Sequence, residues 1–355
     1  MPDRIQVLRE LLKKNGLDAA FITGLTGIRY YSGFTSEDAY LIVTEKRACL
    51  LTDFRYTIQA KEQSPAYEII EFGRGALYST IKDILTAERV TAVGFDEACM
   101  TVAEHTKYTE LDFTWKPFSE ALHSPRVYKC AEEADCLQKA QKLADSAYAE
   151  LLKRIHSGMT EKEVAAELDY IGAKLGSEMP SFETIVGSGP NGAMCHAVPG
   201  SRRLTKGDLV VVDFGCVYNG YHSDMTRTFA VGEPDAFSRR IYGIVLEAQQ
   251  TALGRLKSGV TGKELHNAAL DVIEKAGYGK CFGHGLGHGF GLQIHEAPSA
   301  SPLSKDTLTS GMTITVEPGI YIEGRLGVRI EDCCMVTENG YVNFVSSPKE
   351  LLYIE

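Results

Sequence analysis

Apolar positions in the first 125 residues follow two different spacings. Residues 3–15 repeat leucine and isoleucine at the spacing of one helix face, and Gly16 then ends the predicted helix. Four shorter apolar runs have the length of strands, and we expect helix-length stretches between them. These runs are residues 19–23, 40–43, 48–52 and 92–95. The alternation predicts an α/β domain over residues 1–125, followed by a second domain over residues 126–355.

A long helical pattern begins at Ala131 and leads into an internal repeat. Residues 152–176 align with residues 253–277 without a gap, and nine of the 25 positions are identical. Both copies contain S-G-x-T-x-K-E, which predicts a helix stop followed by a new helix that a capping box opens. The predicted capping pairs are Thr160 with Glu163 and Thr261 with Glu264.

The repeat continues into two predicted hairpins that carry acidic residues inside apolar runs. Asp213 in the first copy corresponds to Glu317 in the second, and Asp224 corresponds to Glu331. Duplicated halves usually pack about a pseudo-two-fold axis. We therefore expect the two pairs of carboxylates to meet at the centre of the second domain.

The first of these hairpins contains Asn219-Gly220, a strong signal for a two-residue turn. Such a turn places Asp213 opposite Thr226 and makes Asp224 the diagonal neighbour of Asp213 on the same face. Two carboxylates at that spacing can share a divalent cation.

The second hairpin, if it is centred on Gly324, places Glu317 directly opposite Glu331. Four buried carboxylates cannot all stay ionised without partners, because each uncompensated charge costs several kcal/mol or more. Two divalent cations carry four positive charges and would compensate the four acids. The pattern therefore favours a dinuclear metal centre over four unrelated surface acids.

A glycine-rich segment, residues 283–298, adds three histidines to these acids: His284, His288 and His295. Glycine lets the backbone approach a ligand closely. If residues 290–295 are extended, alternate side chains point into one cavity. We therefore predict that the three histidines belong to the same site as the carboxylates.

Composition narrows the partners and the compartment. The chain has 355 residues and a net charge of −10, with 44% hydrophobic and 24% charged residues, which is typical of a globular protein. Without a basic block, binding to nucleic acid or to an anionic membrane surface is not expected. The nine cysteines are scattered and never spaced C-x-x-C, which indicates reduced thiols in a cytoplasmic protein.

The order and context of five residues resemble the metal ligands of the pita-bread dinuclear metallopeptidases, a family that includes methionine aminopeptidase, aminopeptidase P and prolidase. These residues are Asp213, Asp224, His288, Glu317 and Glu331. The first domain, including Thr52-Asp53-Phe54-Arg55-Tyr56, resembles the creatinase/prolidase-type N-terminal domain. The resemblance implies an α/β N-terminal domain followed by an α+β pita-bread domain with internal duplication. Because methionine aminopeptidases lack such an N-terminal domain, it favours the Xaa-Pro branch.

This resemblance implies two divalent cations, with Mn²⁺ best suited to four carboxylates and one imidazole, and Co²⁺ or Zn²⁺ as alternatives. Asp213 would bind one ion through both oxygens, Asp224 and Glu331 would bridge the ions, and His288 and Glu317 would complete the other site. The implied catalytic residues are Glu317, His295 and His196, and the implied substrate-contacting residues are His284, Arg329 and Tyr321. Arg329 could bind a carboxylate or tether the neighbourhood of Glu317.

The implied substrate is a peptide with proline in the second position, and the implied assembly is a homodimer. Whether dipeptides or longer peptides are cleaved stays open at this point. Two other hypotheses about the function remain. One is a creatinase-like hydrolase that breaks a C–N bond without metals, and the other is a pita-bread binding protein without catalysis. Both would be expected to lack one or more of the five ligands.

Overall fold

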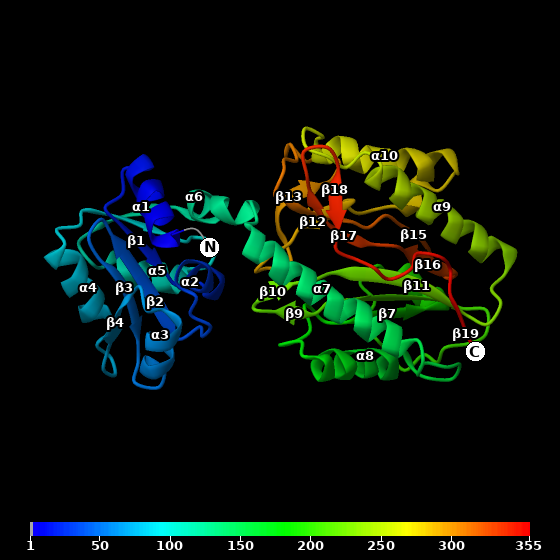
Figure 1. Ribbon diagram of the computed structural model, residues 1–355, viewed down its shortest axis with the longest axis horizontal. Coiled ribbons are helices and arrows are strands. Elements are labelled where there is room, and N and C mark those ends of the chain that lie inside the picture. The colour runs from blue at the N-terminus through cyan, green and yellow to red at the C-terminus, as the bar shows by residue number, and fades with distance from the viewer. Residues whose placement is uncertain (1–2) are drawn as a thin grey trace. The chain divides into compact units, whose positions relative to one another are not determined.

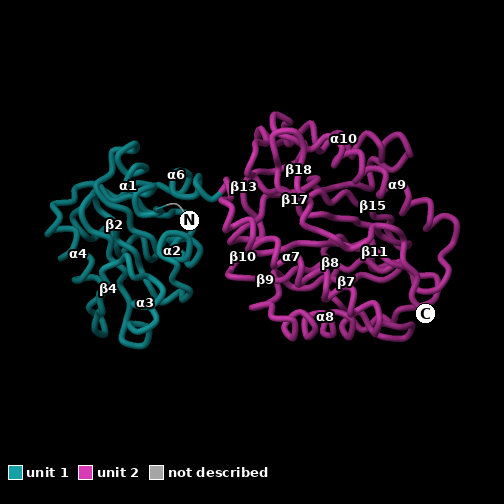
Figure 2. The backbone as a smooth tube through the Cα atoms, in the orientation of Figure 1, with its two compact units in different colours: residues 1–126 teal, residues 127–355 magenta. Residues whose placement is uncertain are grey.

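The computed structural model describes residues 3–355 and divides them into two compact units, of which the first ends at Arg126 and the second begins at Val127 (Figure 2). Each unit has its own hydrophobic core. Across the described residues, no helix has both the length and the apolar character that a membrane span requires.

Unit 1 is built on one mixed sheet with the strand order β4-β3-β2-β1-β5-β6 (Figure 1). Its strands are β1 (Ala19–Ile22), β2 (Ala39–Thr44), β3 (Ala48–Thr52), β4 (Glu68–Glu71), β5 (Ala92–Phe95) and β6 (Thr114–Pro117). Its helices are α1 (Arg4–Lys14), α2 (Leu25–Ser32), α3 (Thr57–Gln63), α4 (Leu77–Ala87), α5 (Val102–Thr109) and α6 (Ser119–His123), followed by the 3₁₀ turn η1 (Ser124–Val127).

Unit 1 confirms the predicted α/β class and the predicted strands, but one expected connection is wrong. Strands β2 and β3 are joined by a tight turn and pair antiparallel, so no helix lies between them. The sequence pattern also missed β4 and β6. Both are edge strands with few buried side chains, and each is ordered by parallel pairing with a buried neighbour, β3 or β5.

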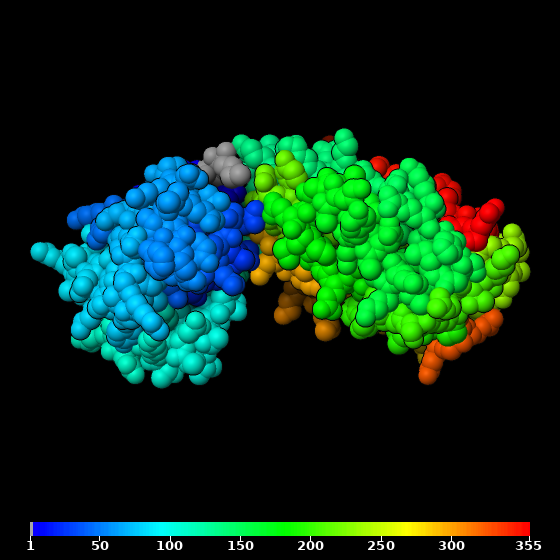
Figure 3. Space-filling view, turned by 90° about the horizontal axis from the view of Figure 1, so that it is seen from below, coloured from blue at the N-terminus to red at the C-terminus, as the bar shows by residue number. Residues whose placement is uncertain are grey.

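Unit 2 contains two helix pairs that correspond to the two copies of the repeat. They are α7 (Ala131–Leu151) with α8 (Glu161–Leu175), and α9 (Ala236–Leu253) with α10 (Gly262–Lys275). Helices α8 and α10 both begin with the predicted capping boxes, in which the threonine hydroxyl and the glutamate carboxylate satisfy each other's backbone N–H groups. The green segment containing α8 forms much of the surface of unit 2 seen from below (Figure 3).

The strands of unit 2 lie between the helix pairs (Figure 1). The first half contributes β7 (Ile185–Ser188), β8 (Leu209–Phe214), β9 (Val217–Tyr218), β10 (Tyr221–His222) and β11 (Met225–Val231), with the 3₁₀ turn η2 (Gly189–Ala193) after β7. The second half contributes η3 (Gly279–Cys281), β12 (Gly287–Gly289), β13 (Glu296–Ala300), β14 (Thr313–Val316), β15 (Gly319–Ile322), β16 (Leu326–Arg329), β17 (Asp332–Val336) and β18 (Tyr341–Asn343). The short strand β19 (Tyr353–Ile354) pairs with β11.

Both predicted hairpin registers are confirmed. Asp213 pairs with Thr226 across β8 and β11. In the second hairpin, Val316 pairs with Asp332 on one side of the two glutamates and Gly319 pairs with Arg329 on the other, so Glu317 and Glu331 share that register. The strands are not continuous as predicted, however. Each hairpin is interrupted beside its acidic residues, where the chain bends from one short sheet into the next.

Candidate metal centre

The interruptions in the strands place the acidic side chains. Asp224 directly precedes β11, Glu317 lies between β14 and β15, and Glu331 lies between β16 and β17. At the first break, a Cβ on Gly215 would lie 1.9 Å from the carbonyl oxygen of Ser223, so only glycine permits this close approach. Asp213 lies on β8 itself, between β7 and β11. The acids of both hairpins therefore lie beside breaks in the strands and meet in one cleft.

Asp224, His288 and Glu331 each have one ligand atom within 4.8 Å of the others, which is close enough to hold a metal ion. The Nε2 atom of His288 lies 3.5 Å from Asp224 Oδ2 and 3.5 Å from Glu317 Oε1. On the other side of the ring, Nδ1 lies 3.0 Å from the carbonyl oxygen of Gly289. That contact assigns the proton to Nδ1 and leaves the lone pair of Nε2 directed at the acids, as a metal-binding histidine requires.

Three carboxylate oxygens at this point are buried without a hydrogen-bond partner: Asp213 Oδ1, Asp224 Oδ1 and Glu331 Oε1. In two of these residues the second oxygen is held firmly. Asp213 Oδ2 accepts from Arg329 at 2.6 Å, and Glu331 Oε2 accepts from the Thr226 hydroxyl at 2.6 Å. Buried polar atoms normally have partners, so these oxygens fit a cation that the acids would bind.

The electrostatics agree with that fit. Burial, and then the nearby charges of the other acids, raise the pKa of Asp224 and of Glu331 well above their usual values. Burial also raises the pKa of Glu317 to about 7. Arg329 is the buried cation that counters these acids, and it carries one positive charge against four carboxylates. Divalent cations would supply the missing positive charge.

Arg329 is 2% exposed and its guanidinium is committed to protein acceptors. Besides Asp213, it donates to the Thr226 hydroxyl at 3.0 Å, to the Cys195 carbonyl at 2.9 Å and to the Tyr321 hydroxyl at 2.8 Å. Arg329 therefore ties Asp213 to Thr226 and Tyr321. Tyr321 in turn lies 2.9 Å from Nε2 of His284.

His284 is held as a neutral ring. Its Nδ1 lies 2.7 Å from the carbonyl oxygen of Gly285, so Nδ1 carries the proton and Nε2 accepts from Tyr321. Burial lowers the pKa of His284 to about 4, which keeps the ring uncharged near neutral pH.

The remaining histidines line the same cleft, which encloses about 560 Å³. His295 and His288 lie with ring centroids 4.3 Å apart, because β12 and β13 pair as a hairpin next to both residues. The expectation of an extended segment over residues 290–295 is wrong. This segment is a series of bends, held where Gly291 accepts from the His222 N–H and donates to the Gln293 carbonyl.

The structure brings nearly all the residues predicted from sequence to this cleft. Its lining includes Asp213, Asp224, His288, Glu317, Glu331, His196, His284, His295 and Arg329. Tyr321 lies behind them, reached through His284 and Arg329. The donor set of four carboxylates and one imidazole around unpartnered oxygens can bind hard or borderline divalent ions.

Comparison with known proteins agrees with this geometry. Residues 135–338 match the sequence model of Metallopeptidase family M24, and residues 4–128 match that of the Creatinase/Prolidase N-terminal domain. The chain belongs to metallopeptidase family M24. This M24 peptidase therefore combines a creatinase-type N-terminal domain with a pita-bread catalytic domain, as the sequence predicted.

Relatives of this M24 peptidase match along its whole length. It is 37% identical to the Xaa-Pro dipeptidase of Pyrococcus furiosus, over 99% of this chain and 100% of the relative. It superposes on the Xaa-Pro dipeptidase structure from Bacillus anthracis with a TM-score of 0.96 and 39% identity, over 99% of both chains. An X-Pro aminopeptidase structure from Thermotoga maritima gives a TM-score of 0.94 and 33% identity, over 99% of this chain and 100% of the other.

Sequence reasoning missed several residues of this M24 peptidase's site. The hydroxyl of Thr226 holds Glu331, and the hydroxyl of Thr315 holds Glu317. Thr226 could have been found from the sequence, because the hairpin register already placed it opposite Asp213. The apolar wall of the cleft had no comparable signal, because all of its members except Ile185, at the start of β7, come from segments outside the helices and strands. Its members are Phe182, Ile185, Val198 and Ile294.

Proposed function

We propose that this M24 peptidase hydrolyses the bond between an N-terminal residue and proline, as an Xaa-Pro dipeptidase. The observation that carries the proposal is the set of five donors in one cleft, three of whose carboxylate oxygens are buried without partners. The full-length similarity to Xaa-Pro dipeptidases supports the choice of substrate. We assign the catalysis to residues 126–355.

The five proposed ligands of two divalent ions are Asp213, Asp224, His288, Glu317 and Glu331. We assign both oxygens of Asp213 to one ion, the bridging positions to Asp224 and Glu331, and the rest of the second site to His288 and Glu317. Held by these residues, two divalent ions would supply Lewis-acid chemistry, which makes a water nucleophilic near neutral pH and favours negative charge on the substrate's carbonyl oxygen. Mn²⁺ is the proposed metal because the donors are hard oxygens and one imidazole without a thiolate.

Glu317 is the proposed proton carrier. The proline nitrogen in the scissile bond has no N–H, so it must be protonated as it leaves. Glu317 lies in the cleft lining with its Oε1 held by the Thr315 hydroxyl at 3.1 Å, which fixes the carboxylate beside His288. A positioned carboxylate of this kind can accept a proton from the attacking water and pass it to the leaving nitrogen.

His196 and His295 are the proposed donors to the substrate. Both rings line the cleft beside the metal ligands, where a hydrogen bond to the scissile carbonyl would stabilise the developing oxyanion. His284 and Arg329 form the proposed wall of the substrate site, and Tyr321 supports that wall from behind. Their hydrogen bonds to each other fix this wall against Asp213, so the substrate would meet a preorganised surface.

Two measurements test the proposal. Metal analysis of the purified protein, followed by hydrolysis of Xaa-Pro dipeptides with added Mn²⁺, is expected to show two ions per chain and proline release. Activity that survives complete metal removal would favour the creatinase-like reading, and metal binding without hydrolysis would favour the non-catalytic one. Parallel assays with Zn²⁺ and Co²⁺ would correct the choice of metal.

An Xaa-Pro aminopeptidase is the second candidate, favoured by the similarity to the Thermotoga maritima structure. Comparing Xaa-Pro dipeptides with Xaa-Pro-Yaa tripeptides under the same conditions separates the two. A higher kcat/KM for tripeptides would replace the dipeptidase assignment.

The assembly and the compartment are also proposals. The resemblance to Xaa-Pro peptidases supports a homodimer, which light scattering coupled to gel filtration would test. The nine cysteines are all free thiols, of which five are buried, three are half-buried and one is exposed, which supports a reducing cytoplasm. Thiol titration of protein isolated under non-reducing conditions is expected to find all nine reduced.

A further inference from the structure

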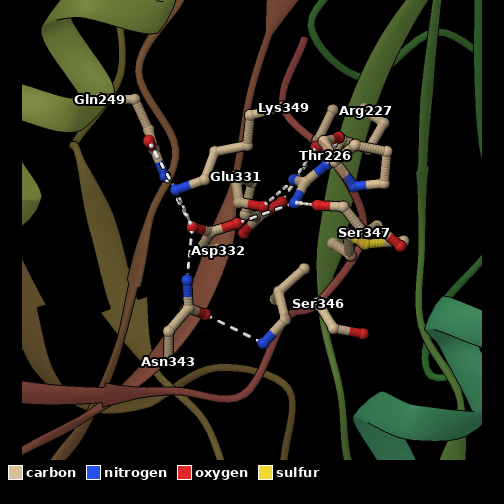
Figure 4. A network of polar contacts seen from close by, with 12 residues as sticks. Thr226, Arg227, Gln249, Glu331, Asp332, Asn343, Ser346, Ser347 and Lys349 are labelled. Carbon is tan, nitrogen blue, oxygen red and sulfur yellow. Dashed lines mark hydrogen bonds and ion pairs between the residues drawn. The ribbon is translucent and has the colours of Figure 1, made fainter. Parts of the chain in front are cut away.

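A buried ion pair between Arg227 and Asp332 lies beside Glu331 of the acidic cluster (Figure 4). The atoms Arg227 Nη2 and Asp332 Oδ1 are 2.9 Å apart, and the two side chains are 1% and 0% exposed. Each residue directly follows a residue of the site in sequence. Arg227 follows Thr226, and Asp332 follows the proposed bridging ligand Glu331.

All five N–H groups of Arg227 have acceptors. The Nη1 atom donates to the carbonyl oxygens of Thr226 at 3.0 Å and of Glu331 at 2.5 Å. Nε and Nη2 donate to the carbonyl oxygens of Pro348 at 3.0 Å and of Ser347 at 2.8 Å, in addition to Asp332. The guanidinium therefore joins the two strand segments that carry Thr226 and Glu331.

Glu331 depends on this junction because it lies in the gap between β16 and β17, outside the strand ladder. Its N–H donates to the Thr226 carbonyl at 3.1 Å, its carbonyl accepts from Arg227, and its carboxylate accepts from the Thr226 hydroxyl. Three of its polar groups are thus held by two consecutive residues of β11.

Asp332 fixes the guanidinium in turn. Its Oδ2 accepts from Gln249 at 3.0 Å, from Asn343 at 2.8 Å and from Lys349 at 2.5 Å, while Oδ1 faces Arg227. Four donors on one buried carboxylate leave it a single orientation, and Arg227 is oriented with it (Figure 4).

The internal duplication shows that burial alone does not require charges here. With Asp224 corresponding to Glu331, the counterpart of Asp332 is Met225 and the counterpart of Arg227 is Cys334. Both counterparts are fully buried. An apolar pair can stabilise such a position as well as an ion pair does, because ions must lose their hydration. What the ion pair adds is directed hydrogen bonds to the backbone of Glu331.

We propose that Arg227, oriented by Asp332, is a positioning residue that fixes the backbone of Glu331 and thereby sets the metal affinity of the centre. The inference rests on the proposed metal centre. Outer partners of metal ligands typically change affinity about 10–100-fold when they are altered. Here the effect would pass through the main chain of the ligand and not through its carboxylate.

The test measures Mn²⁺ affinity and stability separately. Arg227→Lys keeps the charge opposite Asp332 but loses the fork that reaches both carbonyl groups. Asp332→Asn keeps the shape and loses the charge that orients Arg227. We expect each variant to bind Mn²⁺ about 10–100-fold more weakly than the wild type in equilibrium dialysis.

Matched controls are Arg202→Lys and Asp208→Asn. Arg202 and Asp208 form an ion pair at 2.6 Å just before the first residue of β8, whereas Asp213 lies near the last residue of that strand. The controls should lower the thermal unfolding temperature of the metal-free protein while keeping Mn²⁺ affinity within about twofold, since no proposed ligand depends on them. Arg227→Lys is the milder of the two site variants and decides the matter if Asp332→Asn does not fold.

Wild-type Mn²⁺ affinity in a folded Arg227→Lys variant would overturn the inference. So would an equal loss of affinity in the controls, because it would trace the effect to general destabilisation. If the wild type itself binds no Mn²⁺, Zn²⁺ or Co²⁺, the proposed function fails and this inference fails with it. Wild-type binding with unaffected variants overturns the positioning role alone.

Discussion

Thr226 offers a sharp test of how the acidic cluster is held. Its hydroxyl donates to Glu331 Oε2 at 2.6 Å and accepts from Nε of Arg329 at 3.0 Å, and its side chain is completely buried. Thr226→Val keeps nearly the same volume but removes both hydrogen bonds. Because Glu331 Oε1 already lacks a partner, both oxygens of that carboxylate would then be bare in the metal-free protein.

The magnitude follows from the charge of the two partners. A hydrogen bond to a charged group contributes about 1.5–3 kcal/mol, and the substitution removes two such bonds, one to Glu331 and one from Arg329. The two losses are not additive, since both partners belong to one network, so we expect the metal-free protein to lose about 2–4 kcal/mol. Because Glu331 also becomes free to turn, we expect activity at fixed Mn²⁺ to fall about 10–100-fold.

Thr226→Ser is the matched control, since it keeps the hydroxyl and loses one methyl group. Urea unfolding of the chelated proteins and Xaa-Pro hydrolysis at several Mn²⁺ concentrations provide the two measurements. The serine variant should keep activity within a few-fold and lose about 1 kcal/mol for its missing methyl group. Equal activity of the valine variant and the wild type would refute the reasoning, because it would show that Glu331 needs no hydroxyl partner.

Further predictions concern the ligands, the pH response and the helix caps. Glu331→Ala should abolish dipeptide hydrolysis with the circular dichroism spectrum unchanged, and retained turnover would contradict its assignment as a ligand. Chelation should destabilise the protein more at pH 7.5 than at pH 5. Burial and the neighbouring acids raise the pKa of Asp224 and Glu331 in the folded protein, so ionising these acids as the pH rises lowers the stability of the metal-free protein. A metal-dependent gain in melting temperature that does not grow with pH would count against this prediction. In unit 1, burial opposes ionisation of Asp96, but its hydrogen bond and charge contact with His123 hold the pKa below its usual value. The stability that ionised Asp96 contributes is therefore present above about pH 4 and is lost as the pH falls through the lowered pKa. The difference in unfolding free energy between the wild type and Asp96→Asn should narrow in acid, which urea titrations at several pH values would measure. Thr160→Ala should cost about 1 kcal/mol of unfolding free energy by removing the α8 cap, with Thr160→Ser as the control.

Local rules were sufficient for much of this chain. Residue spacing predicted α1, the capping boxes of α8 and α10, and the registers of both acidic hairpins, because each depends on contacts between neighbours in sequence. The two-residue turn at Asn219-Gly220 fixes every pair above it, so the position of Thr226 opposite Asp213 follows by counting. The order of the five acidic and imidazole donors likewise pointed to a metal centre and to its family.

The tertiary structure decided what depends on distant segments. The edge strands β4 and β6 exist because a buried neighbour pairs with them, and their own side chains carry little signal. The breaks that turn Glu317 and Glu331 inward arise where separate short sheets meet. Arg227 and Asp332 are 105 residues apart in sequence, and nothing local indicates that they pair. Sequence periodicity records which face of an element is buried, whereas the partner across that face is chosen by packing and charge compensation in the folded chain.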